Sequence, residues 1–326
     1  MVDAAVVIVT HDTRDEVLGC LASLDGAAVR EVVVVDSGSR DGTAAAVRAA
    51  FPDVRVVELV NVGFGRGANA GLRATTAPVV VVANADVRFA PGAVEVLAAA
   101  FVREPAVGVL GPAVVYPDGR PQASARSFLD PHTALGHALL GRLRPENPWT
   151  RRYHQRDTSA GRARDVDWVS GCAMAVRREA FDAVGGFDPG YFLYVEDAEL
   201  CERMGAAGWR VRYDPRARVT HRVGASTGTR RLRSLTAHAR SWDRYLRRRM
   251  GDGVGARLLR PLVRVGLGLW VVVSWVTERA SRGTRSTTGE RTAWRAPTAG
   301  PIAHTGVQDS RSVGDRSAHA RPGGAP

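Results

Sequence analysis

Two adjacent acidic residues, Glu196 and Asp197, are the strongest candidates for chemistry in this chain. They follow an aromatic run, residues 191–194, and open a segment whose pattern indicates a helix. Acidic residues at a helix start can simply complement the helix dipole. Beside aromatic residues they are also well placed to line a cleft, where a carboxylate can act as a general base.

Further polar side chains follow a β-like run that ends near residue 84. Asn84 and Asp86 place two oxygen-bearing side chains at i and i+2. Oxygen ligands suit Mg²⁺ or Mn²⁺, which usually engage substrate phosphates as well. His221 lies 24 residues after Asp197. A lone histidine is more often structural than a ligand, so spacing alone leaves both interpretations open.

The elements that must position these residues alternate between strand and helix patterns. Nearly continuous β-branched runs occupy residues 4–10, 31–36, 54–59 and 78–84, and helical patterns occupy 14–24, 43–50 and 67–74. Continuous hydrophobicity is typical of parallel strands buried on both faces, and the alternation predicts a doubly wound α/β sheet. Such sheets bind ligands at the carboxyl ends of their strands, so Thr10, Asp36, Asn84 and Asp86 are the residues to consider.

Two loops in this region could contact a ligand. Residues 36–43 form a turn rich in Ser, Gly and Asp, in which Asp41 or Thr43 could cap the next helix. Residues 61–71 are dense in glycine, which could let the backbone approach a ligand, with Arg66 adding positive charge. This glycine run does not follow the first strand, so it does not fit a dinucleotide-binding fingerprint.

Length and composition set further limits. The chain has 326 residues, enough for roughly two domains, and a formal net charge of +12. Cys20, Cys172 and Cys201 lack metal or disulfide spacing, which favours a reducing compartment. The N-terminus enters a β-like run without a charged leader, so we expect no signal peptide.

The C-terminal third has a different composition. Residues 230–260 hold ten Arg against two Asp, and an apolar run follows at residues 261–277. Arg264 leaves only about 13 uncharged residues, short for a transmembrane helix, so the pattern favours an interfacial segment. A charged helix packed on the enzyme is the alternative. Arg clusters also attract nucleic acid, but no recognition module is visible and we expect none bound. Beyond Ser281 the chain is polar and aperiodic, which predicts a disordered tail.

Six segments in order carry a family resemblance: VDSGSRDGT, NVGFGRGANAGL, ANADV, GPAVVYPDGRPQASAR, DWVSGCAMAVRREAFDAVGGFD and FLYVEDAELCERMGAAGW. Together they resemble the inverting family 2 glycosyltransferases with the GT-A fold, in the rhamnosyltransferase-like branch. The resemblance covers roughly residues 4–228. RPENPWTRRYHQ and HRVGASTG are similar to the actinobacterial enzymes that add rhamnose to polyprenyl-diphosphate GlcNAc in arabinogalactan linker synthesis.

The resemblance implies a GT-A domain at residues 1–228, a mixed doubly wound sheet. The composition predicts that a helical, basic membrane-surface segment at 229–280 and a disordered tail at 281–326 follow it. The resemblance also implies roles for individual residues. The catalytic base is Asp197; the metal ligands for Mg²⁺ or Mn²⁺ are Asp86 and His221; the substrate-binding residues are Thr10, Asp36, Asp41, Arg66, Asn69 and Asn84 on the nucleotide side and Trp168 and Glu196 on the acceptor side. Pro189 stands where the family often has Glu, so any role of that carboxylate is lost here.

The implied function is transfer of L-rhamnose from dTDP-rhamnose to a lipid-diphosphate-linked GlcNAc in cell-wall synthesis. The enzyme would be cytoplasmic and peripheral on the inner face of the membrane. A family 2 transferase that uses galactofuranose, mannose or glucose would share every motif. A non-catalytic nucleotide-sugar-binding homologue is a further alternative, but it would be expected to lose Asp86 or Asp197, and both are present.

Overall fold

The computed structural model describes residues 3–128, 144, 147–153, 161–222 and 231–285. Residues up to Thr288 form one compact unit. The predicted tail lies outside the described residues from 286 onward, as do parts of the two segments that resemble the actinobacterial enzymes.

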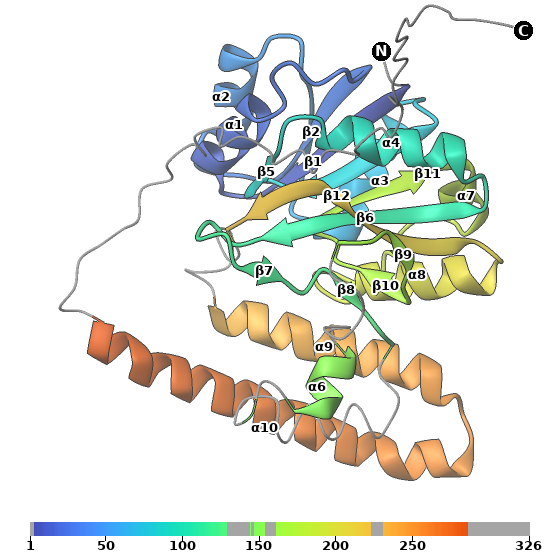
Figure 1. Ribbon diagram of the computed structural model, residues 1–326. Helices are drawn as coiled ribbons and strands as arrows, with labels where there is room; N and C mark the ends of the chain where they lie inside the picture. Colours follow the sequence, from blue (N-terminus) through green and yellow to red (C-terminus); the bar gives the residue numbers. More distant parts are fainter. Residues whose placement is uncertain (1–2, 129–143, 145–146, 154–160, 223–230, 286–326) are drawn as a thin grey trace, which may run out of the picture. The chain divides into compact units, whose positions relative to one another are not determined.

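A ten-stranded mixed sheet forms the centre of this unit (Figure 1). Its main path runs β3-β2-β1-β4-β11-β6-β12-β5, and β7 and β9 pair with β6 and β12. β1 is parallel to β2 and β4, whereas β11 is antiparallel to β4 and β6. β8 and β10 form a separate two-stranded antiparallel sheet. The strands of the two sheets are β1 (Ala4–Thr10), β2 (Glu31–Ser37), β3 (Arg55–Leu59), β4 (Val79–Asn84), β5 (Val87–Phe89), β6 (Val107–Val115), β7 (Pro121–Gln122), β8 (Ala125–Arg126), β9 (Arg164–Asp165), β10 (Trp168–Val169), β11 (Ala173–Arg177) and β12 (Arg210–His221).

Successive side chains of a strand point to opposite faces of the sheet, and in β1, β2 and β4 both sets are apolar. Helices therefore cover both faces. On one face Ile8 packs with Leu21 of α1 and Leu97 of α4, and on the other Val7 packs with Leu72 of α3. The fold class predicted from the alternating pattern is therefore confirmed. The helices are α1 (Arg14–Ala22), α2 (Thr43–Ala50), α3 (Phe64–Arg73), α4 (Ala93–Arg103), α6 (Pro148–Tyr153), α7 (Arg178–Ala183), α8 (Glu196–Ala206), α9 (Arg231–Met250) and α10 (Val254–Arg285).

The glycine-dense run forms the first turns of α3, which begins three residues earlier than expected. A Cβ atom at Gly71 would lie 2.2 Å from Cγ1 of Val7, and one at Gly67 would lie 3.0 Å from Cγ1 of Val9. These glycines therefore serve close packing of α3 on β1 rather than the approach of a ligand to the backbone.

α10 is longer than the sequence estimate of about 13 uncharged residues suggested, because the helix continues through Arg264. Within its segment Val254–Thr277, an 18-residue stretch has a mean hydropathy of 1.5 and is 6% buried, so by length and composition the helix could cross a membrane. Six apolar residues, here called the apolar stripe, recur at intervals of four and three and are 50–71% exposed: Leu258, Leu262, Val265, Leu269, Val272 and Val276.

Candidate active site

The side chain of Asp197, at the start of α8, is held by two backbone amides, one in the loop before β11 and one on α8 itself. Its Oδ2 atom accepts a hydrogen bond from Gly171 N at 2.8 Å, and Oδ1 accepts one from Ala198 N at 2.8 Å. A Cβ atom at Gly171 would lie 3.1 Å from Cβ of Asp197, so a larger residue would press on the carboxylate. Amide donors at a helix N-terminus stabilise the ionised carboxylate.

Its neighbour Glu196 has a different environment. The side chain is buried, and Oε2 has no hydrogen-bond partner among the described residues. Burial, with the nearby Asp197 charge, raises the pKa of Glu196 to about 8. Burial also raises the pKa of Asp197, but the two amide donors and the Arg126 charge oppose this. Of the pair, Asp197 is the carboxyl group whose ionised form is stabilised by two hydrogen bonds, which makes it the better candidate for a base.

The turn before α8 contains two residues with a left-handed backbone. Tyr194 has φ 68° and Val195 has φ 70°, and such conformations cost about 1–3 kcal/mol each in residues other than glycine. α9 holds this turn: the Tyr194 hydroxyl lies 2.7 Å from Oγ of Ser234, and Ser241 Oγ donates to Leu193 O at 2.8 Å. The C-terminal extension thus contacts the turn that presents Asp197.

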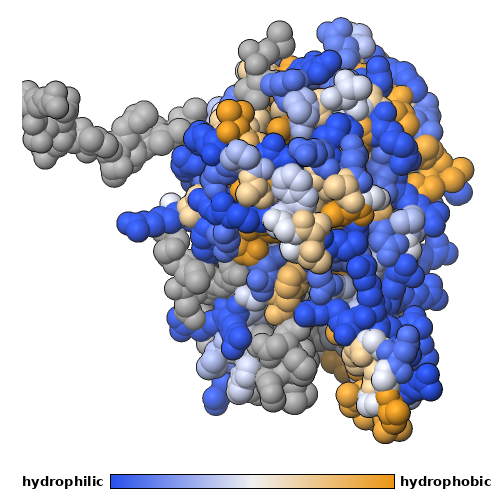
Figure 2. Space-filling view, turned by 90° about the vertical axis from the view of Figure 1, so that its right-hand side faces the viewer, coloured by the Kyte–Doolittle hydropathy of each residue, from blue (hydrophilic) through white to orange (hydrophobic). Residues whose placement is uncertain are grey.

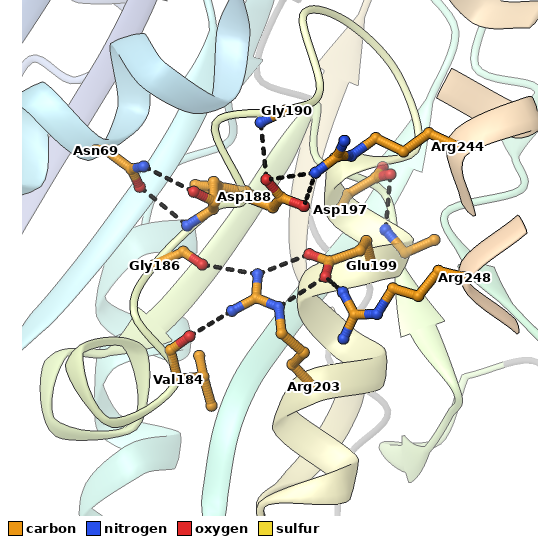
Figure 3. A network of polar contacts seen from close by, with 12 residues as sticks. Asn69, Val184, Gly186, Asp188, Gly190, Asp197, Glu199, Arg203, Arg244 and Arg248 are labelled. Atoms are coloured by element: carbon orange, nitrogen blue, oxygen red, sulfur yellow. Dashed lines mark hydrogen bonds and ion pairs between the residues drawn. The ribbon is translucent and has the colours of Figure 1, made fainter. Parts of the chain in front are cut away.

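A network of ion pairs fixes the rest of α8 (Figure 3). Glu199 is fully buried and accepts two hydrogen bonds from Arg203, at 2.8 and 2.7 Å, and a further one from Arg248 of α9. Arg244, also on α9, pairs with Asp188 at 2.9 Å. α9 is therefore joined through two arginines to the segment that carries the acidic pair.

Asp86 and His221 lie together, although they are far apart in sequence. Nε2 of His221 is 3.3 Å from Oδ1 of Asp86, and Nδ1 is 2.9 Å from Oε1 of Gln122. Although burial opposes protonation, Cys172 and Asp86 raise the pKa of His221 to about 10. Within the described ranges, no group of three or more His, Cys, Asp or Glu side chains converges.

One short stretch of backbone connects this pair to the acidic pair. Asn84, at the end of β4, donates its N–H to Cys172 O at 2.9 Å. The preceding residue, Gly171, donates to Asp197. The fold thereby brings Asn84, two residues before Asp86, and Asp197 to either side of the segment at 171–172.

The expected nucleotide-side residues lie at neighbouring strand ends. Thr10 of β1 is paired with Asp36 of β2, and both side chains are buried. Asp36 accepts a hydrogen bond from Ser39 N at 2.8 Å, and Asp41 accepts one from Arg14 N at 3.0 Å. Although partial burial would raise it, hydrogen bonds from Thr43 and the backbone lower the pKa of Asp41.

The side chains of Arg66 and Asn69 form hydrogen bonds with the protein backbone. Arg66 Nε donates to Pro189 O at 2.9 Å. The Asn69 amide makes two hydrogen bonds with the backbone of Phe187, at 2.8 and 3.0 Å (Figure 3). The structure thus gives both residues contacts with the segment at 187–190, and direct contact with a nucleotide stays a prediction.

Trp168 is buried on β10, three residues before Gly171, whose amide holds the carboxylate of Asp197. Its Nε1 donates to Ser127 O at 3.1 Å, and the guanidinium of Arg126 lies 4.8 Å from its ring centre. Gln122, Arg126 and Gly171 all belong to motifs quoted above, but no local pattern gave them roles. Their contacts arise only when distant segments meet.

Two family models, both of glycosyl transferases, match this chain. Residues 5–185 match the model described as Glycosyl transferase family 2, and residues 151–291 match Glycosyl transferase family 21. The N-acetylglucosaminyl-diphospho-decaprenol L-rhamnosyltransferase of Mycobacterium tuberculosis is 40% identical over 250 residues, which is 72% of this chain and 81% of that protein.

Two solved structures are similar in fold, each at 19% identity and a TM-score of 0.51. The mannosyltransferase PcManGT from Pyrobaculum calidifontis, in complex with GDP-Man and Mn²⁺, matches over 88% of this chain and 76% of its own. GalNAc-T7 with UDP, GalNAc and Mn²⁺ matches over 67% and 43% respectively. At this identity the likeness shows the fold alone.

Proposed function

The chain belongs to glycosyl transferase family 2 and is a glycosyltransferase, and from this premise we propose that it transfers L-rhamnose from dTDP-rhamnose to a polyprenyl-diphosphate-linked GlcNAc. The support for donor and acceptor is the 40% identity to the mycobacterial rhamnosyltransferase over most of that protein. The observation that supports catalysis is the position of Asp197. Its carboxylate accepts a hydrogen bond from Gly171, and the next residue, Cys172, accepts one from Asn84.

The proposed reaction is a single displacement. Asp197 takes the proton from an acceptor hydroxyl as that oxygen attacks the anomeric carbon, while the bond to the nucleoside diphosphate breaks and the configuration inverts. The amides of Gly171 and Ala198 hold the carboxylate, and each of its oxygens keeps a lone pair for the incoming hydroxyl. Glu196, largely neutral below its pKa of about 8, would donate a hydrogen bond to the acceptor sugar.

The Asp86–His221 pair fits a divalent cation of the kind expected. One carboxylate and one imidazole are too few for a closed protein site, but Mg²⁺ and Mn²⁺ commonly take substrate phosphates and water for their remaining ligands. The Gln122 contact at Nδ1 favours a proton there, which leaves Nε2 facing Asp86. Asp86 and His221 would hold the cation, which supplies Lewis-acid stabilisation of the charge on the departing diphosphate.

The nucleotide would occupy the ends of β1 and β2, where Thr10, Asp36 and Asp41 lie. Their carbonyl and carboxylate oxygens suit the donor groups of a base and a ribose. Asn84 lies next to this edge, since β4 pairs with β1 up to Asn84. Arg66 and Asn69 would act through the 187–190 segment that they hold.

The α9–α10 hairpin supports a location at the inner membrane surface. Figure 2 shows hydrophobic residues gathered at the lower edge of a mainly hydrophilic face, at the level of α10 in Figure 1. The opposite side of α10 contacts α9, through Arg264 with Asp243 and Trp270 with His238. A helix held along its length in this way presents the apolar stripe to the headgroup region while α9 stays in water.

A panel of nucleotide sugars tests the proposal. Purified full-length protein with Mn²⁺ or Mg²⁺ is given a polyprenyl-diphosphate GlcNAc and dTDP-rhamnose, or the UDP or GDP donors of galactofuranose, mannose and glucose. Rhamnosylated lipid in the first reaction alone is the expected result. Transfer from another donor instead would reassign the sugar, and donor binding without transfer from any donor would indicate a binding protein.

A further inference from the structure

Arg126 is a partly buried cation without an ionic partner among the described residues. Its Nε donates to Ala123 O at 3.0 Å, and Nη1 has only a long contact, 3.4 Å, with the Tyr153 hydroxyl. Its guanidinium lies over two buried rings, 4.8 Å from the centre of Trp168 and 5.7 Å from that of Tyr153. The second terminal nitrogen, Nη2, has no hydrogen-bond partner in the part of the chain that the structure describes.

Three other arginines with little exposed side chain are better satisfied. Arg203 pairs with Glu199, and Arg88 pairs with Glu16. Arg177 donates to three backbone carbonyl groups instead. Removing a guanidinium from water without a counter-ion is unfavourable. An arginine that has no carboxylate partner within the protein is therefore suited to binding an anionic ligand.

The surroundings of Arg126 show that it lies near the proposed base Asp197 and near α9. Its charge opposes the effect of burial on the pKa of Asp197, and it adds to burial in lowering the pKa of His238 to about 4. Neutral His238 accepts a hydrogen bond from Trp242 and packs against Tyr194 and Trp270. Arg126 therefore lies close enough to both Asp197 and His238 of α9 for its charge to act on each of them.

We propose that Arg126, stacked on Trp168 and Tyr153, binds a phosphate of the acceptor's diphosphate. This rests on the proposed function, which gives the acceptor a sugar hydroxyl at Asp197, a diphosphate on the same sugar ring and a lipid beyond it. Arg126 stacks on Trp168, three residues before the Gly171 amide that holds Asp197, so a phosphate bound at Arg126 would lie near a sugar whose hydroxyl reaches Asp197. Arg is suited to this task because its planar fork makes two parallel hydrogen bonds to phosphate oxygens.

The experiment compares two acceptors in full-length protein: a short-chain polyprenyl-diphosphate GlcNAc and an alkyl GlcNAc glycoside, which has no phosphate. In Arg126→Met we expect the KM of the diphosphate acceptor to rise about 10- to 100-fold, as for loss of hydrogen bonds to a charged group. The kcat/KM for the alkyl glycoside should fall far less, because only the smaller effect of the lost charge on Asp197 applies to it. Arg126→Lys, which keeps the charge but loses the fork, should lie in between.

A matched control and a donor measurement complete the design. Arg120→Met changes an exposed arginine six residues earlier in the chain, whose side chain pairs with Asp118 and lies over the Tyr116 ring, and should leave both acceptors unaffected. An equal loss with both acceptors would overturn the proposal, because it would mark a structural or base-tuning role. Weaker Mn²⁺-dependent binding of dTDP would also overturn it, by assigning Arg126 to the donor. If wild-type protein glycosylated neither acceptor, the proposed function itself would fail.

Discussion

Arg248 of α9 pairs with Glu199, a fully buried carboxylate two residues after Asp197 on α8. The C-terminal extension is thus part of the support for the catalytic segment as well as a surface for other contacts. Tyr194 and Ser234, paired at 2.7 Å, add a second connection at the left-handed turn.

The two arginines that pair with Glu199 should differ in how much they contribute to the free energy of unfolding. Arg203→Met removes the bidentate partner of Glu199 and should lower the free energy of unfolding by about 3–5 kcal/mol, the usual cost of breaking a buried pair. Arg248→Met leaves Arg203 in place and should cost less, about 1 kcal/mol. Urea unfolding of the two variants checks the order, and the reverse order would mean that α9 provides the main support.

Asp197→Asn should fold and bind donor normally but transfer sugar about 10²- to 10⁴-fold more slowly, because a general base is lost. Single-turnover kinetics with saturating acceptor measure the effect. Glu202→Gln, on the same helix and paired with Arg249, is the matched control and should keep its rate. Near wild-type turnover in Asp197→Asn would remove this residue from the mechanism.

Asp86→Ala and His221→Ala should each weaken Mn²⁺-dependent binding of dTDP by about tenfold or more, measured by calorimetry with and without the metal. Gln122→Leu removes the partner of Nδ1 and should weaken metal-dependent binding about 10- to 100-fold, the usual effect of losing an outer contact to a metal ligand. Metal-free dTDP affinity is the internal control. Unchanged metal dependence in His221→Ala would exclude it as a ligand.

The raised pKa of Glu196 predicts a pH dependence of stability. Its pKa is about 8 in the folded protein, against an ordinary value of 4.5, so the folded state binds the proton more tightly. The free energy of unfolding should therefore fall as pH rises from about 4.5 to about 8, and stay level above that. The upward shift of Asp197 has the same sign. Glu196→Gln should flatten the slope in urea titrations across this range, and an unchanged slope would contradict the burial argument.

The apolar stripe should hold the protein on lipid. Leu262→Asp and Leu269→Asp should each reduce flotation with anionic vesicles about tenfold or more, since burying a leucine is worth about 1.5–3 kcal/mol. Val102→Asp replaces an exposed valine on α4 and should have no effect. The arginine contribution should fall with salt, whereas the stripe contribution should not. A wild-type protein that stays in the soluble fraction at low salt would contradict the membrane assignment.

Local sequence was enough for the sheet and for the family. Strands buried on both faces need nearly continuous β-branched runs, so β1, β2 and β4 could be bounded to within a residue or so before the structure was considered. Polar residues at their carboxyl ends, such as Thr10 and Asp36, identified the edge where a ligand would bind. Ordered motifs around Asp86 and Asp197 then indicated the family, which the comparisons confirm.

Tertiary structure alone decided how the candidate residues are held. The contacts of Asp197 with Gly171, Glu199 with Arg248 and His221 with Gln122 join positions 26, 49 and 99 residues apart. Hydrophobic periodicity reports only which face of one element is buried, so it carries no information on such pairs. The same holds for Arg126, whose lack of an ionic partner among the described residues depends on which side chains the fold places around it.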